Sequence, residues 1–314
     1  MLSRTAGNLF WMARYIERSE YVARLLDVAV RMTALSGSGI EAGNEWDSLL
    51  AAAGCEETFA EAYDTATASN VIRFMALDAD NPSSIWAAFE QARSNARAER
   101  TALTTDVWSA INDTWLARTV LEQARGGPDD LAEVIDWVKS RAAAIRGAWE
   151  STTLRNDAHE FVRLGFALER ADNTARLIDV KYHVLLPSHE EVGGGLDHVH
   201  WDSILRAATA LRAYQHVYRA PVKPRLVVEL MVLRPEMPRS IRASYDEIVA
   251  ALGALSAFYG GRKGEADRRA GATHAALAFA TVDEVFAQGL HEYLENIIAS
   301  TTALGEAIFD QYMS

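Results

Sequence analysis

The residues best suited to chemistry are carboxylates and guanidinium groups that recur in one order at two places in the chain. At 100° per residue, each set falls within a narrow arc of one helix. Paired carboxylates can hold a cation, or act as general acids or bases where burial raises their pKa. The two rows are Glu17, Glu20, Arg24 and Asp27, and then Glu169, Asp172, Arg176 and Asp179.

The spacing within each row predicts both attraction and repulsion. Glu20 precedes Arg24 by four residues, which is the favourable acid-before-base order for an exposed helix pair. Glu17 lies three residues before Glu20, so two like charges are neighbours on the helix surface. We expect an opposite charge to face them, from a neighbouring helix, the other row, a metal ion or a cationic partner group. A structural ion network and a ligand or partner site are both open.

Further cations lie toward the apolar side of the second motif helix. Arg163, Arg170 and Lys181 fall on one line with Thr174, and Arg18 has the place of Arg170 in the first helix. Cations at a core boundary are costly unless they are paired or face a cavity. They therefore pair with buried acids from other helices, extend to solvent at the edge of the apolar face, or line a pocket for an anionic group. The candidate ligand or partner residues are Glu17, Arg18, Glu20, Arg24, Asp27, Glu169, Arg170, Asp172, Arg176, Asp179 and Lys181.

Established catalytic signatures are missing from the sequence. It contains no P-loop, no glycine-rich dinucleotide turn, no nucleophile elbow and no His-Glu-x-x-His pair. The segment from His291 to Glu295 has one histidine only, and we expect it on a surface helix. Neither acidic row has the Glu-x-x-His elements of a carboxylate-bridged di-iron bundle. We therefore predict no metal and no cofactor, and assign no catalytic residue.

The two rows belong to an internal repeat. Three blocks recur in the same order at an offset of 152 to 156 residues, as expected for a tandem duplication. We predict two helical repeats, 1–155 and 156–314, that form one compact body. Each Pro-x-Ser block predicts a helix start, and Trp46 and Trp201 are expected to anchor the core. The matched blocks are Ile16–Val28 with Leu168–Val180, Trp46–Leu50 with Trp201–Leu205, and Asn81–Ile85 with Met237–Ile241.

The elements that position these residues are predicted to be helices only. Ala, Leu, Glu, Arg and Gln dominate, and alternating β-branched patterns are scarce, so the fold class is all-α: two pseudo-repeats of a multi-helix unit packed as one bundle-like body. Ser3 is the expected N-cap of a first helix that reaches about Met32, and breaks are expected at 36–39, 126–128, 187–195 and 260–264, with 187–195 resembling a junction. The other predicted helices are 45–65, 68–77, 82–101, 104–124, 129–151, 157–186, 199–218, 223–233, 238–260 and 281–312.

The composition narrows the class of protein. A chain of 314 residues with 49% hydrophobic residues can bury a large core. Its net charge of −12 disfavours nucleic acid and anionic membranes as partners. Cys55 is the single cysteine, which excludes a disulfide framework and suits a small buried residue. The sequence has no signal-peptide core and no uninterrupted apolar span, so we expect a cytoplasmic protein.

Two segments carry a family resemblance, namely Leu168 to His183 and the opening Leu2 to Ala6 with Asn8 and Leu9. They resemble the bacterial Alpha-E family, an α-helical domain with a duplicated Glu-Arg motif that was formerly a domain of unknown function. The resemblance covers almost the whole chain. It departs at Ser19 and at Tyr21-Val22, where relatives resemble Ala171 and Asn173-Thr174, so the two halves are not expected to bind identical ligands.

The resemblance implies a function by association. Alpha-E proteins are typically encoded beside, or fused to, a circularly permuted ATP-grasp ligase, often with a transglutaminase-like protein. This implies a non-catalytic helical partner in a system that makes or modifies a peptide or amide conjugate. One alternative is an enzyme or ligand-binding protein that uses the acid-arginine cluster, with a metal or a bound amine to complete the charge balance. Another is a scaffold protein unrelated to amide chemistry.

Overall fold

The structure, a computed structural model, describes residues 1–36, 44–124, 128–184 and 195–314. Within these ranges the chain forms helices and no strand, which confirms the all-α prediction. The predicted breaks at 37–39 and 126–127, and most of the predicted junction at 187–195, lie outside the described residues. None of the helices described is both long enough and apolar enough to cross a bilayer.

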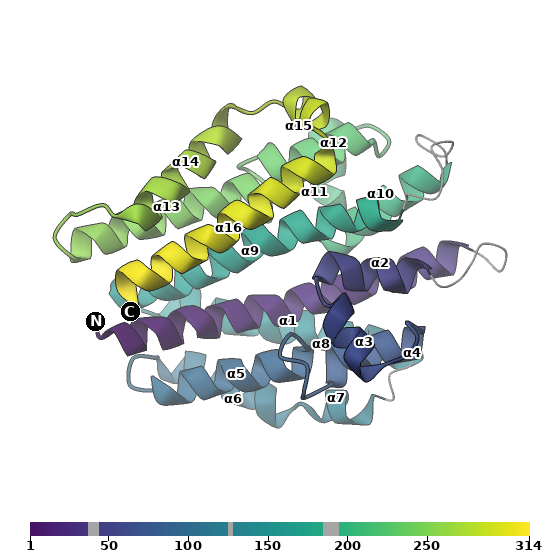
Figure 1. Cartoon of the computed structure of the whole chain (residues 1–314). Helices are drawn as coiled ribbons and strands as arrows, with labels where there is room; N and C mark the ends of the chain where they lie inside the picture. Colours follow the sequence, from purple (N-terminus) through teal and green to yellow (C-terminus); the bar gives the residue numbers. More distant parts are fainter. Residues whose placement is uncertain (37–43, 125–127, 185–194) are drawn as a thin grey trace.

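Two long helices lie side by side through the centre of the molecule: α1 (Ser3–Ser36) and α9 (Asp157–Val184) (Figure 1). On the α1 side pack α5 (Ile85–Ala98), α6 (Thr105–Leu116) and α8 (Pro128–Thr152). On the α9 side pack α13 (Ile241–Phe258), α14 (Glu265–Phe279) and α16 (Leu290–Tyr312). The buried apolar residues of both halves form one continuous cluster, so the halves share a core.

The central position of α1 explains why its charged arc is not a solvated face. Helices α9, α5, α8, α10 and α2 all contact it. Ile16 and Leu26 on one side and Glu17 and Glu20 on the other are each at most 2% exposed. A helix that is surrounded must bury its polar arc together with its apolar one, and buried charges require partners.

Shorter helices connect the long ones. In several places the structure has two helices where the sequence predicts one. The segment 45–65 is divided at Gly54, and 199–218 at Thr209, where both residues have a positive φ (67° and 58°) that stops a helix. Gly289, at φ 98°, divides 281–312 in the same way. The short elements are α2 (Asn44–Ala53), α3 (Glu56–Ala62), α4 (Ala68–Ile72), η2 (Arg73–Leu77), α7 (Thr119–Gln123), α10 (Gly195–Ala207), α11 (Leu211–Tyr218), α12 (Pro224–Val228), η3 (Glu229–Leu233) and α15 (Val282–Gln288).

Two other expectations need correction. Helix α14 was not predicted, because its alanine-rich sequence after Gly264 has only a weak apolar stripe and follows a run of glycines. Ser3 is not an N-cap, because it is the first helical residue of α1, and Ala6 N–H donates to the Leu2 carbonyl at 3.0 Å. Trp46 and Trp201 are each 3% exposed, which confirms them as core residues.

Both Pro-x-Ser blocks start helices, as predicted. Ser84 Oγ accepts from Ala87 N–H at 3.0 Å and donates to the Asp78 carbonyl at 2.5 Å. Ser240 Oγ accepts from Ala243 N–H at 2.9 Å and donates to the Arg234 carbonyl at 2.6 Å. Each block follows a π-helical turn, η2 or η3, that begins 156 residues from its counterpart (73 to 229). These local matches accord with the repeat, and the duplication itself stays a prediction.

Candidate functional site

Glu17 lies at the centre of a buried ion network between the two motif helices. Its carboxylate is 3.0 Å from Arg146 of α8, 3.3 Å from Arg170 of α9, and 3.1 Å from Arg239, which precedes α13. The Glu17 side chain is only 2% exposed. Three guanidinium groups from three parts of the chain therefore surround one carboxylate.

Glu20 extends the same network by one helical turn. Its oxygens are 2.5 Å from Arg146 and 2.5 Å from Arg239, and it also pairs with Arg24 on its own helix. Arg24 in turn donates to Thr209 Oγ1 at 2.9 Å. The repulsion expected between Glu17 and Glu20 is offset because Arg146 and Arg239 each contact both carboxylates.

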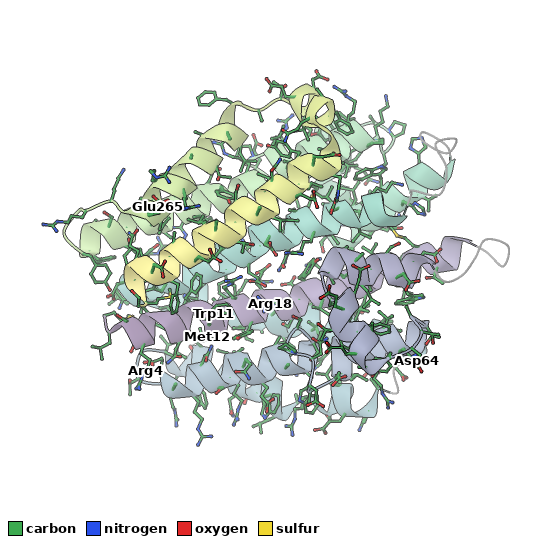
Figure 2. The ribbon with its side chains drawn as sticks, viewed as in Figure 1. Arg4, Trp11, Met12, Arg18, Asp64 and Glu265 are labelled. Carbon is green, nitrogen blue, oxygen red and sulfur yellow. The ribbon has the colours of Figure 1, made fainter. Side chains whose placement is uncertain are left out.

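Glu169 on α9 has the reciprocal arrangement. Arg18 of α1 donates to its two oxygens at 2.7 and 3.2 Å, and Arg14 donates at 2.7 Å. Arg18 thus reaches from α1 to Glu169, just as Arg170 reaches from α9 to Glu17. Figure 2 shows Arg18 near the middle of the molecule, where α1 and α9 run together. Of the open alternatives for neutralising the acids, the structure realises two: the other row and neighbouring helices.

Asp172, the counterpart of Glu20, has a smaller set of partners. Arg176 of its own helix donates to it at 2.8 Å, and this is the only ion pair of Asp172 among the residues that the structure describes. Its side chain is 19% exposed, against 2% for Glu20. The two rows therefore differ most at this position.

The outer acids of the two rows pair with flanking helices. Asp27 contacts Arg31 at 2.8 Å and Lys139 of α8 at 3.0 Å. Asp179 contacts His291 of α16 at 2.7 Å. His291 is thus turned toward α9 and is 16% exposed, whereas Glu295 on the same helix is 63% exposed. The segment lies on a helix at the surface, as predicted, with one face against α9. In the described part of the chain, no three His, Cys, Asp or Glu side chains are grouped as metal ligands.

Lys181, the last predicted site residue, lies away from the network. Its ammonium is 3.2 Å from His200 Nδ1 and 5.9 Å from the centre of the Trp201 ring. Arg163 is 3.5 Å from Glu160 on its own helix. Arg163 and Arg170 both line a cavity of about 490 Å³, but Lys181 does not. The predicted line of cations therefore converges only in part, and each of its members has its own partner.

A cavity of about 220 Å³ lies against the network, between α1, α9, the end of α2 and the segment that precedes α5. Arg18, Glu169, Asp172 and Arg176 contribute to its wall, so four predicted site residues meet there. Two more wall residues carry buried polar atoms that have no hydrogen-bond partner, Tyr21 Oη and Asn173 Nδ2. They are 8% and 6% exposed. Groups of this kind are rare in folded proteins unless water or a ligand satisfies them.

Cys55 also lines this cavity, and it is partly exposed, whereas we expected a small buried residue. Burial, together with Glu56, raises the pKa of its thiol to about 12. A thiol with such a pKa remains protonated at neutral pH and is a poor nucleophile. Cys55 is therefore part of the wall rather than a reactive centre.

The network keeps its carboxylates ionised. Burial by itself would raise the pKa of Glu17, but Arg170, Arg146 and Arg239 outweigh it and hold this pKa well below its usual range. Glu20 and Glu169 follow the same logic, with Arg239 and Arg18 as their strongest opposing charges. Asp172 differs, because burial raises its pKa and Arg176 does not compensate fully.

These shifts predict how stability depends on pH. A carboxyl group whose pKa is lower in the folded state stabilises the fold above its unfolded pKa, about 4.3 for Glu, and this stabilisation is lost as the pH falls. We expect the melting temperature, followed by circular dichroism, to fall steeply from about pH 5 to pH 3. Asp172 contributes with the opposite sign, because its folded pKa is raised. Glu169→Gln, which lacks one of these groups, should show a shallower fall; identical slopes in both proteins would contradict the assignment.

The sequence did not single out several residues of the site. Arg14, Arg146 and Arg239 complete the ion pairs, but each lies outside the two matched rows. Arg239 falls inside the matched Pro-x-Ser block opposite Ser83, and this difference between the repeats was the one signal available. Tyr21 falls inside the motif opposite Asn173, so the difference between these two residues was visible in the sequence.

Comparison with known proteins identifies a family for this chain. A family model described as a predicted α-helical domain with a conserved ER motif matches residues 1–313. No curated protein and no solved structure matches the chain. The two Glu-Arg pairs, Glu17-Arg18 and Glu169-Arg170, are those that exchange ion pairs across α1 and α9.

Proposed function

The chain belongs to the Alpha-E family, and we propose that it acts as a non-catalytic helical partner protein. Its proposed partners are a circularly permuted ATP-grasp amide ligase and a transglutaminase-like protein, in a cytoplasmic peptide-modification system. The observation that carries the proposal is the internal neutralisation of the Glu-Arg motif. Arg18 and Arg170 are paired with Glu169 and Glu17, so the motif holds α1 and α9 together. A motif with this role builds a rigid body for a partner to bind.

The protonation states of the motif support the same function. A general acid or base needs a pKa near the working pH. The pKa values of Glu17, Glu20 and Glu169 are all lowered, away from neutrality. These carboxylates are therefore suited to permanent ion pairs rather than to proton transfer.

An exposed apolar patch offers a surface for the partner. We infer it from Leu2, Leu154, Phe258 and Tyr259, which belong to three segments that hydrogen bonds bring together. These side chains are 78%, 75%, 54% and 41% exposed. The Tyr259 hydroxyl donates to Asp157 at 2.8 Å, and the Met1 amino group donates to Tyr259 at 3.0 Å, so the three segments meet there. Gathered apolar side chains on a surface are typical of protein interaction sites.

Co-purification tests this function. The tagged chain should retain the ligase encoded with it, and Leu154→Asp with Phe258→Asp should release the ligase while the melting temperature of the chain is unchanged. Leu116→Asp is a matched control, because Leu116 is also exposed (60%) but lies on α6. Absence of a complex, together with unaltered ligase activity when the chain is omitted, would refute the proposal.

A second candidate function is ligand binding by the acid-arginine cluster. The observation that favours it is the cavity beside Arg18, Glu169, Asp172 and Arg176, with the unpartnered atoms of Tyr21 and Asn173 in its wall. A ligand there would lie between the two motif helices. It would not require the ligase.

A further inference from the structure

The cavity between the motif helices has a counterpart, and Tyr21 and Asn173 contribute to the walls of both pockets. This second pocket has a volume of only about 10 Å³. Nine of the twelve residues that line the larger cavity correspond to lining residues of the smaller one when they are matched at the offset of the repeat (152 to 156 residues). The two pockets are therefore the same place in the two halves, and one is filled.

Arg239 fills the smaller pocket. Its guanidinium is 3.1 Å from Glu17 and 2.5 Å from Glu20, so it bridges the two acids of the first row. The matched residue in the larger cavity is Ser83, whose side chain is uncharged and much shorter than that of arginine. The backbones of the two residues are equivalent, because each directly precedes a serine that caps a helix through the same pair of hydrogen bonds.

The acids that face Ser83 lack the cation that their counterparts have. Glu17 and Glu20 share four guanidinium groups, from Arg24, Arg146, Arg170 and Arg239. Glu169 and Asp172 share three, from Arg14, Arg18 and Arg176. One further positive charge in the cavity would give the two acids of the second row four cationic partners, as many as the two acids of the first row have.

We propose that the cavity binds an organic cation, a guanidinium or primary ammonium group, that lies between Glu169 and Asp172 as the guanidinium of Arg239 lies between Glu17 and Glu20. This inference rests on the second candidate function, ligand binding at the cluster, and is independent of the ligase. The Tyr21 hydroxyl oxygen, buried and unpartnered in the wall, supplies a further acceptor for an N–H donor.

The state of Asp172 agrees with this assignment. Its pKa is raised because burial outweighs the single guanidinium of Arg176, whereas the pKa of Glu20 is lowered once Arg239 offsets burial. A bound cation would lower the pKa of Asp172 toward that of its counterpart. The cavity volume of about 220 Å³ suits the end of one side chain or a small amine.

Titration of the isolated chain with methylguanidinium, ethylammonium and acetate at constant ionic strength tests the proposal. We expect a saturable rise in melting temperature and a single site by calorimetry with one or both cations, with a dissociation constant on the order of millimolar for so small a ligand. An arginine-containing peptide that binds more tightly than methylguanidinium would identify a side chain as the natural occupant. Weaker binding of the peptide would identify a free small cation.

Variants taken from the repeat itself sharpen the test. Ser83→Arg should supply the cation internally, raise the melting temperature and abolish the response to methylguanidinium. Asp172→Asn should weaken binding roughly tenfold through loss of a charge-assisted hydrogen bond. Arg239→Ser is the matched control, because it should open a second site, which methylguanidinium fills with partial recovery of stability.

The outcomes distinguish ligand binding at the cavity from the narrower assignment of the ligand as a cation. No saturable response of the wild-type chain to either cation overturns the proposal, whatever the variants do. If acetate binds at the cavity and the cations do not, ligand binding stands but the assignment to a cation is wrong. A decrease in the melting temperature of Ser83→Arg, with cation binding retained, would also overturn it, because the cavity would then not be the cation site.

Discussion

Replacement of Glu17 by glutamine is expected to lower the free energy of unfolding by about 3 kcal/mol or more, because a buried ion pair that loses one partner leaves the others uncompensated. Arg146, Arg170 and Arg239 all contact Glu17, and each is between 13% and 21% exposed. Glutamine keeps the shape of the side chain, removes its charge and replaces one acceptor oxygen with an NH2 donor. Urea unfolding followed by circular dichroism would measure the change.

Glu247→Gln is the matched control for this variant. Glu247 also faces Arg170, but at 4.0 Å and with its side chain 40% exposed. Loss of such a solvated pair is expected to change stability by less than about 1 kcal/mol. If the two variants had equal effects, the network at Glu17 would be no more than a set of surface contacts. A double variant, Glu17→Gln with Arg239→Gln, should be less destabilised than the sum of its single variants, because the two groups interact.

Replacement of Gly165 by alanine is expected to have the second large effect. Gly165 lies on α9 where this helix crosses α1, and a Cβ atom there would overlap the Phe10 carbonyl oxygen and lie 3.0 Å from Ala13 Cβ. Backbone cannot yield as a flexible side chain does, so the central helices would have to separate. Overpacking of this kind typically costs about 1–3 kcal/mol, and here it would also disturb the ion pairs between the helices.

Gly253→Ala is the control, because Gly253 is an exposed residue of α13 with open space around it. Alanine there should raise stability by about 0.5–1 kcal/mol through the better helix propensity. Thermal unfolding of the two variants would therefore show shifts of opposite sign. A neutral Gly165→Ala would mean that α1 and α9 are not in close contact at this point.

The helical class of the protein and the position of its charged motifs follow from local sequence. Residues 3–36 and 157–184 form long helices because their composition favours helix and lacks breakers, and helix periodicity places Glu17, Glu20 and Arg24 on one arc. The starts of α5 and α13 were predictable because Ser84 and Ser240 act on their own next turn. Each of these features depends on residues only a few positions apart.

The partners of the motif are a different matter, because they come from distant parts of the chain. Arg146 and Arg239 reach Glu17 across 129 and 222 residues, and helix periodicity does not specify which helix will pack on a given face. The sequence shows that Ser83 and Arg239 differ at matched positions. Only the folded chain shows that Arg239 fills its pocket and that Ser83 leaves the matched pocket open. Local sequence determined the helices and their charges; the packing of α1 against α9 decided which charges are buried together, because burial depends on neighbours that are remote in sequence.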